Sequence, residues 1–209
     1  MDNIVQLASL RKEKEYQLIS FINQHVNSIQ GYVDRHVNIR EKVKAKHIFS
    51  GKIGSETIPV FSNLQEQLFI DWFTYDYLTI RGMTIYQTFV TQQGNNRHPL
   101  DPVVHALFMA SVLEPFKVIK SAETHIYAEK LLSGEQCKIK IHSNRVVPYQ
   151  DEVIFLRSIP VFDQFICISD IFVQREKASI LNLLTHLDKE SEGWRTFLKK
   201  FAIKYCWSN

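Results

Sequence analysis

Two aspartates in one aromatic stretch are the first candidates for chemistry in this sequence. The stretch LFIDWFTYDYL, residues 68–78, sets Asp71 and Asp76 among five aromatic rings. Two carboxylates that converge on a substrate can serve as a general acid and a general base. On a helix, however, side chains five residues apart point in different directions. The spacing therefore predicts separate roles for the two acids.

The periodicity of this stretch favours a buried helix over a catalytic cleft. At 100° per residue one apolar stripe forms, and it is widened on one side; its members are Phe61, Leu64, Leu68, Trp72 and Tyr75, with Phe69 and Phe73 beside them. Asp71 falls outside this arc and is expected to be solvated. Asp76 falls inside it and needs a partner, because an unpaired buried carboxylate is costly. We expect Arg81 to pair with Asp76 and to anchor the turn to the next helix.

Three histidines recur at intervals of eleven residues: His25, His36 and His47. Eleven residues make almost three helical turns, so the three rings would share one face of a continuous helix. Neighbouring rings would then lie roughly 16 Å apart, too far to share a metal ion. The pattern predicts a polar seam in a helix–helix contact, with a pH-sensitive dimer seam as the alternative.

The remaining histidines do not predict a metal or catalytic site. Asp101 and His105 are four residues apart with His98 nearby, but no third or fourth ligand is evident, so capping and surface roles are expected. His125 and His142 would face each other in the β portion of the chain. Neither has a serine or cysteine beside it in a recognisable activating context, so we expect no catalytic role for them.

Known catalytic and cofactor motifs are missing from the sequence. It contains no GxGxxG, P-loop, HExxH, GxSxG or CxxC. Cys137, Cys167 and Cys206 are odd in number and far apart, which argues against a disulfide framework and a cysteine-based zinc site. We therefore expect no metal and no cofactor. An enzyme whose site is assembled from distant residues stays as an alternative.

Composition indicates an ordinary globular protein. Of 209 residues, 45% are hydrophobic and 22% charged. No uninterrupted apolar run reaches about 18 residues, so no membrane span is expected. An acid at position 2 and an early charge cluster are the wrong order for a secretion signal, and we expect a cytoplasmic protein with reduced thiols. No segment has the dense basicity of an obligate nucleic-acid binder.

Helical patterns fill the first half of the chain. Residues 3 to about 46 predict one helix, or two helices broken near Gly31, followed by a loop or hairpin over 49–61. Pro59 suits the first turn of the aromatic helix. Thr84 to Gln87 fits a capping box for a helix that ends near Gly94. A further helix is expected from an N-cap at Asp101, with Pro102 in its first turn, to about Leu113.

From Phe116 the period changes to that of strands. Five strand-like segments, with tight turns at Ser133-Gly134 and near Phe162–Gln164, predict a small antiparallel barrel or a strongly bent sheet. Two helices, at about 176–188 and 193–206, close the chain. The fold class is α+β, with a mainly helical domain over 1–115, a barrel-like domain over 116–175, and helices over 176–209 that pack back on the body.

Two features together resemble a known family. The segment FIDWFTYDYLTIRGMTIYQTFV is similar to the acidic-Trp-Phe-x-x-Asp-Tyr … Gly-x-Thr-hydrophobic segment of uncharacterised bacterial proteins that often carry the metal-binding SEC-C motif. The turn at 131–135 and the strand with Glu152, Arg157 and Pro160 match the small β unit of that group. The resemblance covers roughly Phe61 to Ile171. It implies a helical portion followed by a compact barrel, and no enzyme activity. The cysteine-rich SEC-C motif is absent from the sequence, so the resemblance implies no metal function here.

The function that these observations favour is a non-catalytic one. We expect a bacterial adaptor or regulator that binds another protein, and we consider a homodimer through the N-terminal helix. One apolar face of the last helix is a candidate partner-binding surface, made of Trp194, Phe197, Phe201 and Tyr205. Docking of that face on the protein's own core is the favoured alternative for it.

A nucleic-acid-binding barrel is the alternative function. Six basic residues fall among the early strands: Lys117, Lys120, Lys130, Lys138, Lys140 and Arg145. Small barrels bind nucleic acid through such side chains. Glu123, Glu129 and Glu135 are interleaved with them, however, and a merely solvated strand face has the same pattern.

Overall fold

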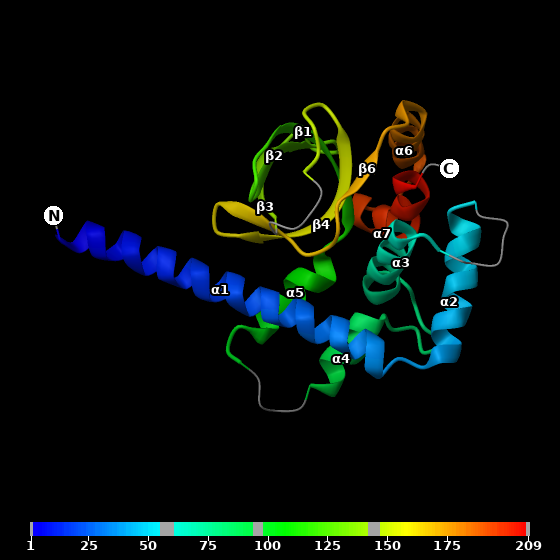
Figure 1. Ribbon diagram of the computed structural model, residues 1–209, viewed down its shortest axis with the longest axis horizontal. Coiled ribbons are helices and arrows are strands. Elements are labelled where there is room, and N and C mark those ends of the chain that lie inside the picture. The colour runs from blue at the N-terminus through cyan, green and yellow to red at the C-terminus, as the bar shows by residue number, and fades with distance from the viewer. Residues whose placement is uncertain (1, 55–60, 94–97, 142–146, 208–209) are drawn as a thin grey trace.

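Helices flank a small barrel in the computed structural model of the chain (Figure 1). The structure describes residues 2–54, 61–93, 98–141 and 147–207. In those ranges the helices are α1 Asp2–Arg35, α2 Ile39–Lys52, α3 Asn63–Tyr75, α4 Ile85–Gln92, α5 Asp101–Ala110, α6 Lys177–Lys189 and α7 Trp194–Cys206. The strands are β1 Leu113–Ser121, β2 His125–Lys130, β3 Gln136–Lys140, β4 Val153–Val161, β5 Gln164–Cys167 and β6 Phe172–Gln174. The α+β fold class with a small barrel is confirmed.

The first five strands close into a barrel. Their order is β1-β2-β3-β5-β4, and β4 pairs with β1 to close the barrel. Strand β6 pairs with the first residues of β4, Val153 to Phe155, which do not pair with β5. All of these pairings are antiparallel except that of β3 with β5, so the barrel is mixed. The last strand-like segment of the sequence is split into β5 and β6 by residues 168–171. β1 begins at Leu113 and α6 at Lys177, close to the expected boundaries at 116 and 176.

Strand β4 is buried on both of its faces, and this joins the barrel to the helices. Ile154 and Leu156 point into the barrel core. Phe155, Ile159 and Val161 point outward into a larger core shared with α1–α5 and with α6 and α7. The nearly continuous apolar run VIFLRSIPV is the expected sequence of a strand covered on both sides.

Helix α3 is largely buried from Leu68 onward, as predicted, whereas Leu64, which was expected in the same buried stripe, is 42% exposed. Its Leu68, Phe69 and Phe73 have no exposed surface, and Ser62 begins it with a capping box completed by Gln65. The predicted capping box from Thr84 to Gln87 is also present, at the start of α4. The helix expected to start at Asp101 does start there, but the N-cap is Leu100.

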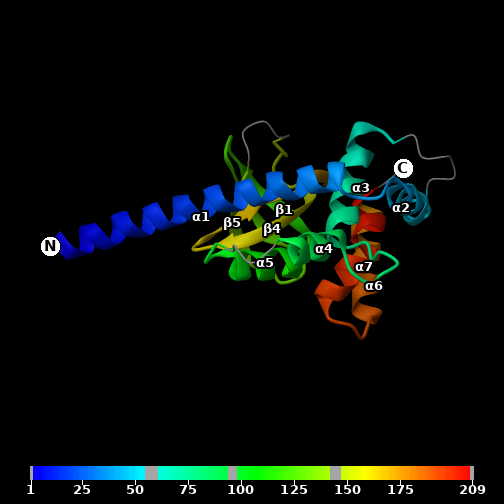
Figure 2. The same cartoon turned by 90° about the horizontal axis from the view of Figure 1, so that it is seen from below.

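Helix α1 is a 34-residue helix that projects beyond the other elements at its N-terminal end (Figure 2). The break expected near Gly31 lies instead at residues 36–38, where the Asn38 side chain accepts a hydrogen bond from the Arg40 N–H and so begins α2. Figure 2 shows α1 running along the molecule, with its first turns extending past the other elements. Gln164 of β5 donates to Glu15, which places α1 against the barrel. Residues 6–14 are exposed.

Candidate functional site

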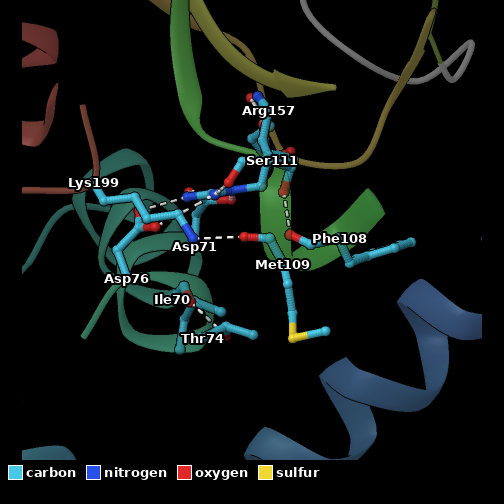
Figure 3. A network of polar contacts seen from close by, with 11 residues as sticks. Ile70, Asp71, Thr74, Asp76, Phe108, Met109, Ser111, Arg157 and Lys199 are labelled. Atoms are coloured by element: carbon cyan, nitrogen blue, oxygen red, sulfur yellow. Dashed lines mark hydrogen bonds and ion pairs between the residues drawn. The ribbon is translucent and has the colours of Figure 1, made fainter. Parts of the chain in front are cut away.

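Arg157 is the centre of a buried polar network that joins three parts of the fold (Figure 3). It lies on the helix-facing side of β4 and is 0% exposed. Its Nε and Nη2 donate to the two oxygens of Asp71 over 3.1 and 2.9 Å, and Nη2 also donates to Oδ2 of Asp76 over 2.6 Å. Nη1 donates to the carbonyl of Ser111 over 2.8 Å. The guanidinium lies 4.7 Å from the centre of the Tyr75 ring.

Two predictions about the aspartates were wrong. Asp71 is buried and not solvated. The ion-pair partner of Asp76 is Arg157, whereas Arg81 is exposed. The rule for side chains five residues apart on a helix does not apply to Asp71 and Asp76. Asp76 is the C-cap of α3, and its backbone is no longer α-helical, with φ of −123° and ψ of −24°. Its carboxylate can therefore meet the same guanidinium as Asp71.

Two carboxylates share one guanidinium, which leaves the network short of positive charge. Burial raises the pKa of Asp76 to about 6, and Arg157 and the nearby Lys199 oppose this rise. Lys199, on α7, donates to the carbonyl of Met109 over 2.6 Å. The ammonium group thereby places compensating charge beside the carboxylates, and it ties α7 to α5.

The network has no room for a substrate. The cavity beside Asp71 holds about 50 Å³ and is also lined by Val26, Tyr75 and Ser169. This volume suits a few water molecules at most. The Trp72 and Phe73 rings are buried in the core and do not line an open cleft. We therefore assign Asp71 and Asp76 a structural role, in which both carboxylates hold Arg157.

The histidine seam predicted from the eleven-residue interval is not formed. Because α1 ends at Arg35, His36 and His47 are not on one continuous helix with His25, and both are exposed. His25 is buried, with Nε2 at 2.8 Å from the hydroxyl of Tyr86 and its ring 5.1 Å from that of His105. Burial lowers the pKa of His25 to about 4, with His105 adding to the fall.

The other histidines supply no metal site in the described part of the chain. Asp101 accepts a hydrogen bond from the His98 N–H over 2.7 Å, and the His98 ring stacks on Phe21. Across residues 2–54, 61–93, 98–141 and 147–207, no three His, Cys, Asp or Glu side chains are placed to hold a metal ion. The suggested contact between His125 and His142 lies outside the described residues, because His142 does.

The apolar face of α7 packs on the protein itself. Phe197 and Tyr205 are buried, and Trp194 and Phe201 are half-buried against the same core. His186 of α6 lies against this face, with Nδ1 at 2.7 Å from the Tyr205 hydroxyl. Docking of this face on the protein's own core, the favoured alternative, accounts for the burial of Phe197 and Tyr205 and for the partial burial of Trp194 and Phe201.

The five of the six basic candidates that the structure describes do not form one patch on the barrel. Lys117 pairs with Asp151 at 3.2 Å. Lys130 pairs with Glu135 at 2.6 Å and lies 4.3 Å from the centre of the Phe165 ring. Lys140 lies opposite His125 in the β2–β3 pair. Arg145 lies outside the described residues.

Lys120 and Lys138 are brought together on the outer face of the barrel, with an aromatic ring between them. Tyr127 of β2 is opposite Lys120 of β1 and also opposite Lys138 of β3. The three side chains line a groove of about 850 Å³, whose far wall is the turn between β4 and β5 with Phe162 and the following strand with Phe165. Tyr127 is 42% exposed and Phe162 is 53% exposed.

Sequence reasoning missed the aromatic residues of this groove, which are Tyr127, Phe162 and Phe165. The strand pattern carried the signal for Tyr127, because it alternates with the inward-facing Ile126 and Ala128 in HIYAEK. Phe162 lies at the tip of a predicted turn with φ of 53°, a conformation rare for bulky side chains. The Arg11 guanidinium of α1 lies 5.6 Å from the Phe162 ring and 3.7 Å from Asp163, so α1 supports this rim.

No family model, curated protein or solved structure matches the chain. The resemblance to SEC-C-associated bacterial proteins therefore stays a prediction. Among the described helices, none combines the length and the apolar character needed to cross a membrane.

Proposed function

We propose that the protein is a non-catalytic binder of single-stranded nucleic acid, which it holds in the groove over β1, β2 and β3. The observation that carries this proposal is the row Lys120–Tyr127–Lys138, in which one exposed ring lies between two lysines on neighbouring strands. Stacking of a base on an aromatic ring contributes about 1–3 kcal/mol and tolerates any sequence. A base stacked on Tyr127 would leave its flanking phosphates within reach of both ammonium groups.

The charge distribution of the groove supports this proposal. Its acids are already paired, Glu135 with Lys130 and Asp163 with Arg11. Among the described residues, Lys120 and Lys138 make no ion pair within 4.0 Å, which leaves both free for phosphate. Burial lowers the pKa of the neighbouring His125, and the positive charges of Lys138 and Lys140 lower it further.

The position of the groove supports the proposal by analogy of architecture. Five-stranded barrels of the OB type bind oligonucleotides across their second and third strands and the loops between strands 1–2 and 4–5. The groove here uses β2, β3 and the β4–β5 turn. Architecture alone does not define function; the side chains of Lys120, Tyr127 and Lys138 would provide the contacts to the nucleic acid.

The test is fluorescence anisotropy with labelled single-stranded DNA and RNA of about 12 nucleotides, a length in the range that one small barrel covers. We expect binding at low salt that weakens at least tenfold in Tyr127→Ala. Tyr149→Ala is the matched control, because Tyr149 is exposed and does not line the groove. Absence of binding at low salt would refute the proposal, since phosphate contacts are strongest there.

A protein-binding adaptor is the second candidate, and one observation favours it. Leu7 and Leu10 are exposed on the projecting part of α1. Each lies eleven residues before a half-buried core residue, Leu18 and Phe21, so the apolar side of the helix continues beyond the body. Light scattering and native pull-down with Leu7→Glu/Leu10→Glu as the control would test it. The adaptor hypothesis is supported if the natural protein forms a homodimer or retains a partner and the variant does not. It is opposed if the natural protein and the variant behave identically.

A further inference from the structure

A second groove lies at one mouth of the barrel, away from the row of Lys120, Tyr127 and Lys138. It holds about 430 Å³ between the strand ends and the helices α5 and α7. Its apolar walls include Leu107 of α5, Leu187 of α6 and Trp194 of α7. Barrel mouths are frequent sites for small ligands, and this volume is within the usual range of such sites.

Glu114 is the polar group at the inner side of this groove. It follows the alternation of β1, in which Phe116 and Val118 point into the barrel core. Glu114 is 9% exposed. Within the described part of the chain, its carboxylate makes no hydrogen bond to another side chain or to the backbone, and no ion pair within 4.0 Å. Its oxygens are not among the fully buried polar atoms left without a partner, so they face the groove, where a donor from water or from a ligand can reach them.

The two cations near Glu114 are engaged elsewhere. Lys130 lies on the same groove but pairs with Glu135 and with the Phe165 ring. Arg195 is at the exposed rim, with its guanidinium 4.3 Å from the centre of the Trp194 ring. Burial raises the pKa of Glu114, and the charges of Lys130 and Arg195 oppose the rise without either residue forming a contact pair.

We propose that the barrel mouth binds a small apolar primary amine, whose ammonium group donates to Glu114 and whose body packs against Trp194, Leu187 and Leu107. The ammonium would supply the donor that the carboxylate lacks, and the walls would bury the apolar part of the ligand. Arg195 also lines this groove, and its guanidinium can donate to a carboxylate of the ligand. An amine that also carries an α-carboxylate, as an amino acid does, fits the same groove.

The experiment uses the full chain and follows the indole N–H resonance of Trp194 by NMR. The probes are 2-phenylethylamine, phenylalanine and 3-phenylpropionate, which share the ring and differ in charged groups. We expect the two amines to shift the resonance in a saturable manner and the acid to leave it unchanged. Stronger binding of phenylalanine would identify the amino acid as the better ligand, and stronger binding of 2-phenylethylamine would identify the simple amine.

Glu114→Gln should weaken amine binding at least tenfold, because the amide keeps the shape and loses the charge. Glu123→Gln removes the same charge from an exposed turn and should leave the affinity unchanged. Leu107→Ala keeps both Glu114 and the Trp194 resonance and should also weaken binding, which provides a test should Glu114→Gln fail to fold. Failure of both amines to bind, equal binding by 3-phenylpropionate, or unchanged affinity in Glu114→Gln would overturn the inference. The two grooves share Glu135, Pro160 and Phe165, but Lys120, Tyr127 and Lys138 do not line this one, so either result leaves the nucleic-acid proposal unaffected.

Discussion

Arg157 and Asp71 are separated by 86 residues in the sequence, and Nη2 of the arginine donates to Oδ2 of the aspartate over 2.9 Å. This contact joins a barrel strand to the central helix α3 in a fully buried position. Asp76 and the Ser111 carbonyl bind the same guanidinium from two further segments. One buried side chain thereby links the barrel to α3 and to the junction of α5 and β1, in addition to the apolar core that the barrel and the helices share.

Replacing this arginine should destabilise the protein strongly. Arg157→Met leaves two buried carboxylates without their counter-ion, and breaking a buried pair in this way costs about 3–5 kcal/mol. Urea denaturation followed by circular dichroism would measure the loss. Arg81→Met is the control and should change the free energy of unfolding by no more than about 0.5 kcal/mol, because Arg81 is exposed. Equal decreases in the free energy of unfolding in both variants would indicate that Arg81 also pairs with Asp76.

The buried His25 should make the protein less stable in mild acid. Its pKa is about 4 in the folded protein, whereas a free histidine has a pKa of 6.5. Between these pH values the unfolded chain binds more protons at His25 than the folded chain does. The contribution of neutral His25 to the free energy of unfolding is therefore complete above pH 6.5 and falls as the pH is lowered towards 4. The pKa of Asp76 is raised to about 6, so this residue makes the free energy of unfolding change with pH in the opposite direction.

Comparison with His25→Gln isolates the histidine from Asp76. Glutamine keeps a polar group near the Tyr86 hydroxyl and does not titrate in this range. Urea midpoints measured from pH 7 to pH 4 should fall more steeply for the natural protein than for the variant. Parallel curves would show that His25 takes up its proton equally in both states.

Two glycines should respond to alanine in opposite directions. Gly134 closes the β2–β3 turn with φ of 71°, where an L side chain is strained, and Gly134→Ala should cost about 1 kcal/mol. Gly31 lies within α1, and an added Cβ there would meet nothing within 4 Å. Gly31→Ala should therefore stabilise the helix by about 0.5–1 kcal/mol. Thermal unfolding should show a lower melting temperature for Gly134→Ala and a higher one for Gly31→Ala. A lower melting temperature for Gly31→Ala would contradict the prediction for α1.

Lys120 and Lys138 should determine the salt dependence of nucleic-acid binding in the proposed groove. Each lysine that contacts a phosphate adds about 0.7 to the slope of log affinity against log salt for a single strand. Lys120→Ala and Lys138→Ala should each lower the slope by roughly that amount. Lys117→Ala is the matched control, because Lys117 is paired with Asp151 and does not line the groove. An equal decrease in all three variants would indicate a diffuse charge effect without a defined groove.

Local sequence signals were sufficient for most of the fold. The capping box at Thr84, the turn at Gly134 and the buried stripe around Trp72 all depend on residues within a few positions of one another. The partner of Asp76 could not be found in this way, because it is 81 residues distant. Nothing in a local window distinguishes Arg157 from any other basic residue of a strand, although a charge in the middle of VIFLRSIPV is unusual for a strand buried on both faces.

The candidate sites were harder to predict for the same reason. The sequence identified the six basic residues but not the register that separates them, so Lys130 and Lys138 looked equivalent although they line different surfaces of the barrel. The sequence alone does not distinguish Tyr127 from the other aromatic residues, because its two lysine neighbours lie on other strands. Glu114 directly precedes Pro115 at the point where helix gives way to strand, and its burial follows from the position of α7 some 80 residues later.

Photochemical crosslinking tests the proposed nucleic-acid groove most directly. A single-stranded oligonucleotide with a photoreactive base is irradiated with the full chain at low salt, and the modified peptides are mapped by mass spectrometry. The account predicts crosslinks at Tyr127 and in the turn that carries Phe162, and their loss at high salt. Crosslinks confined to other surfaces, or none at low salt, would contradict it.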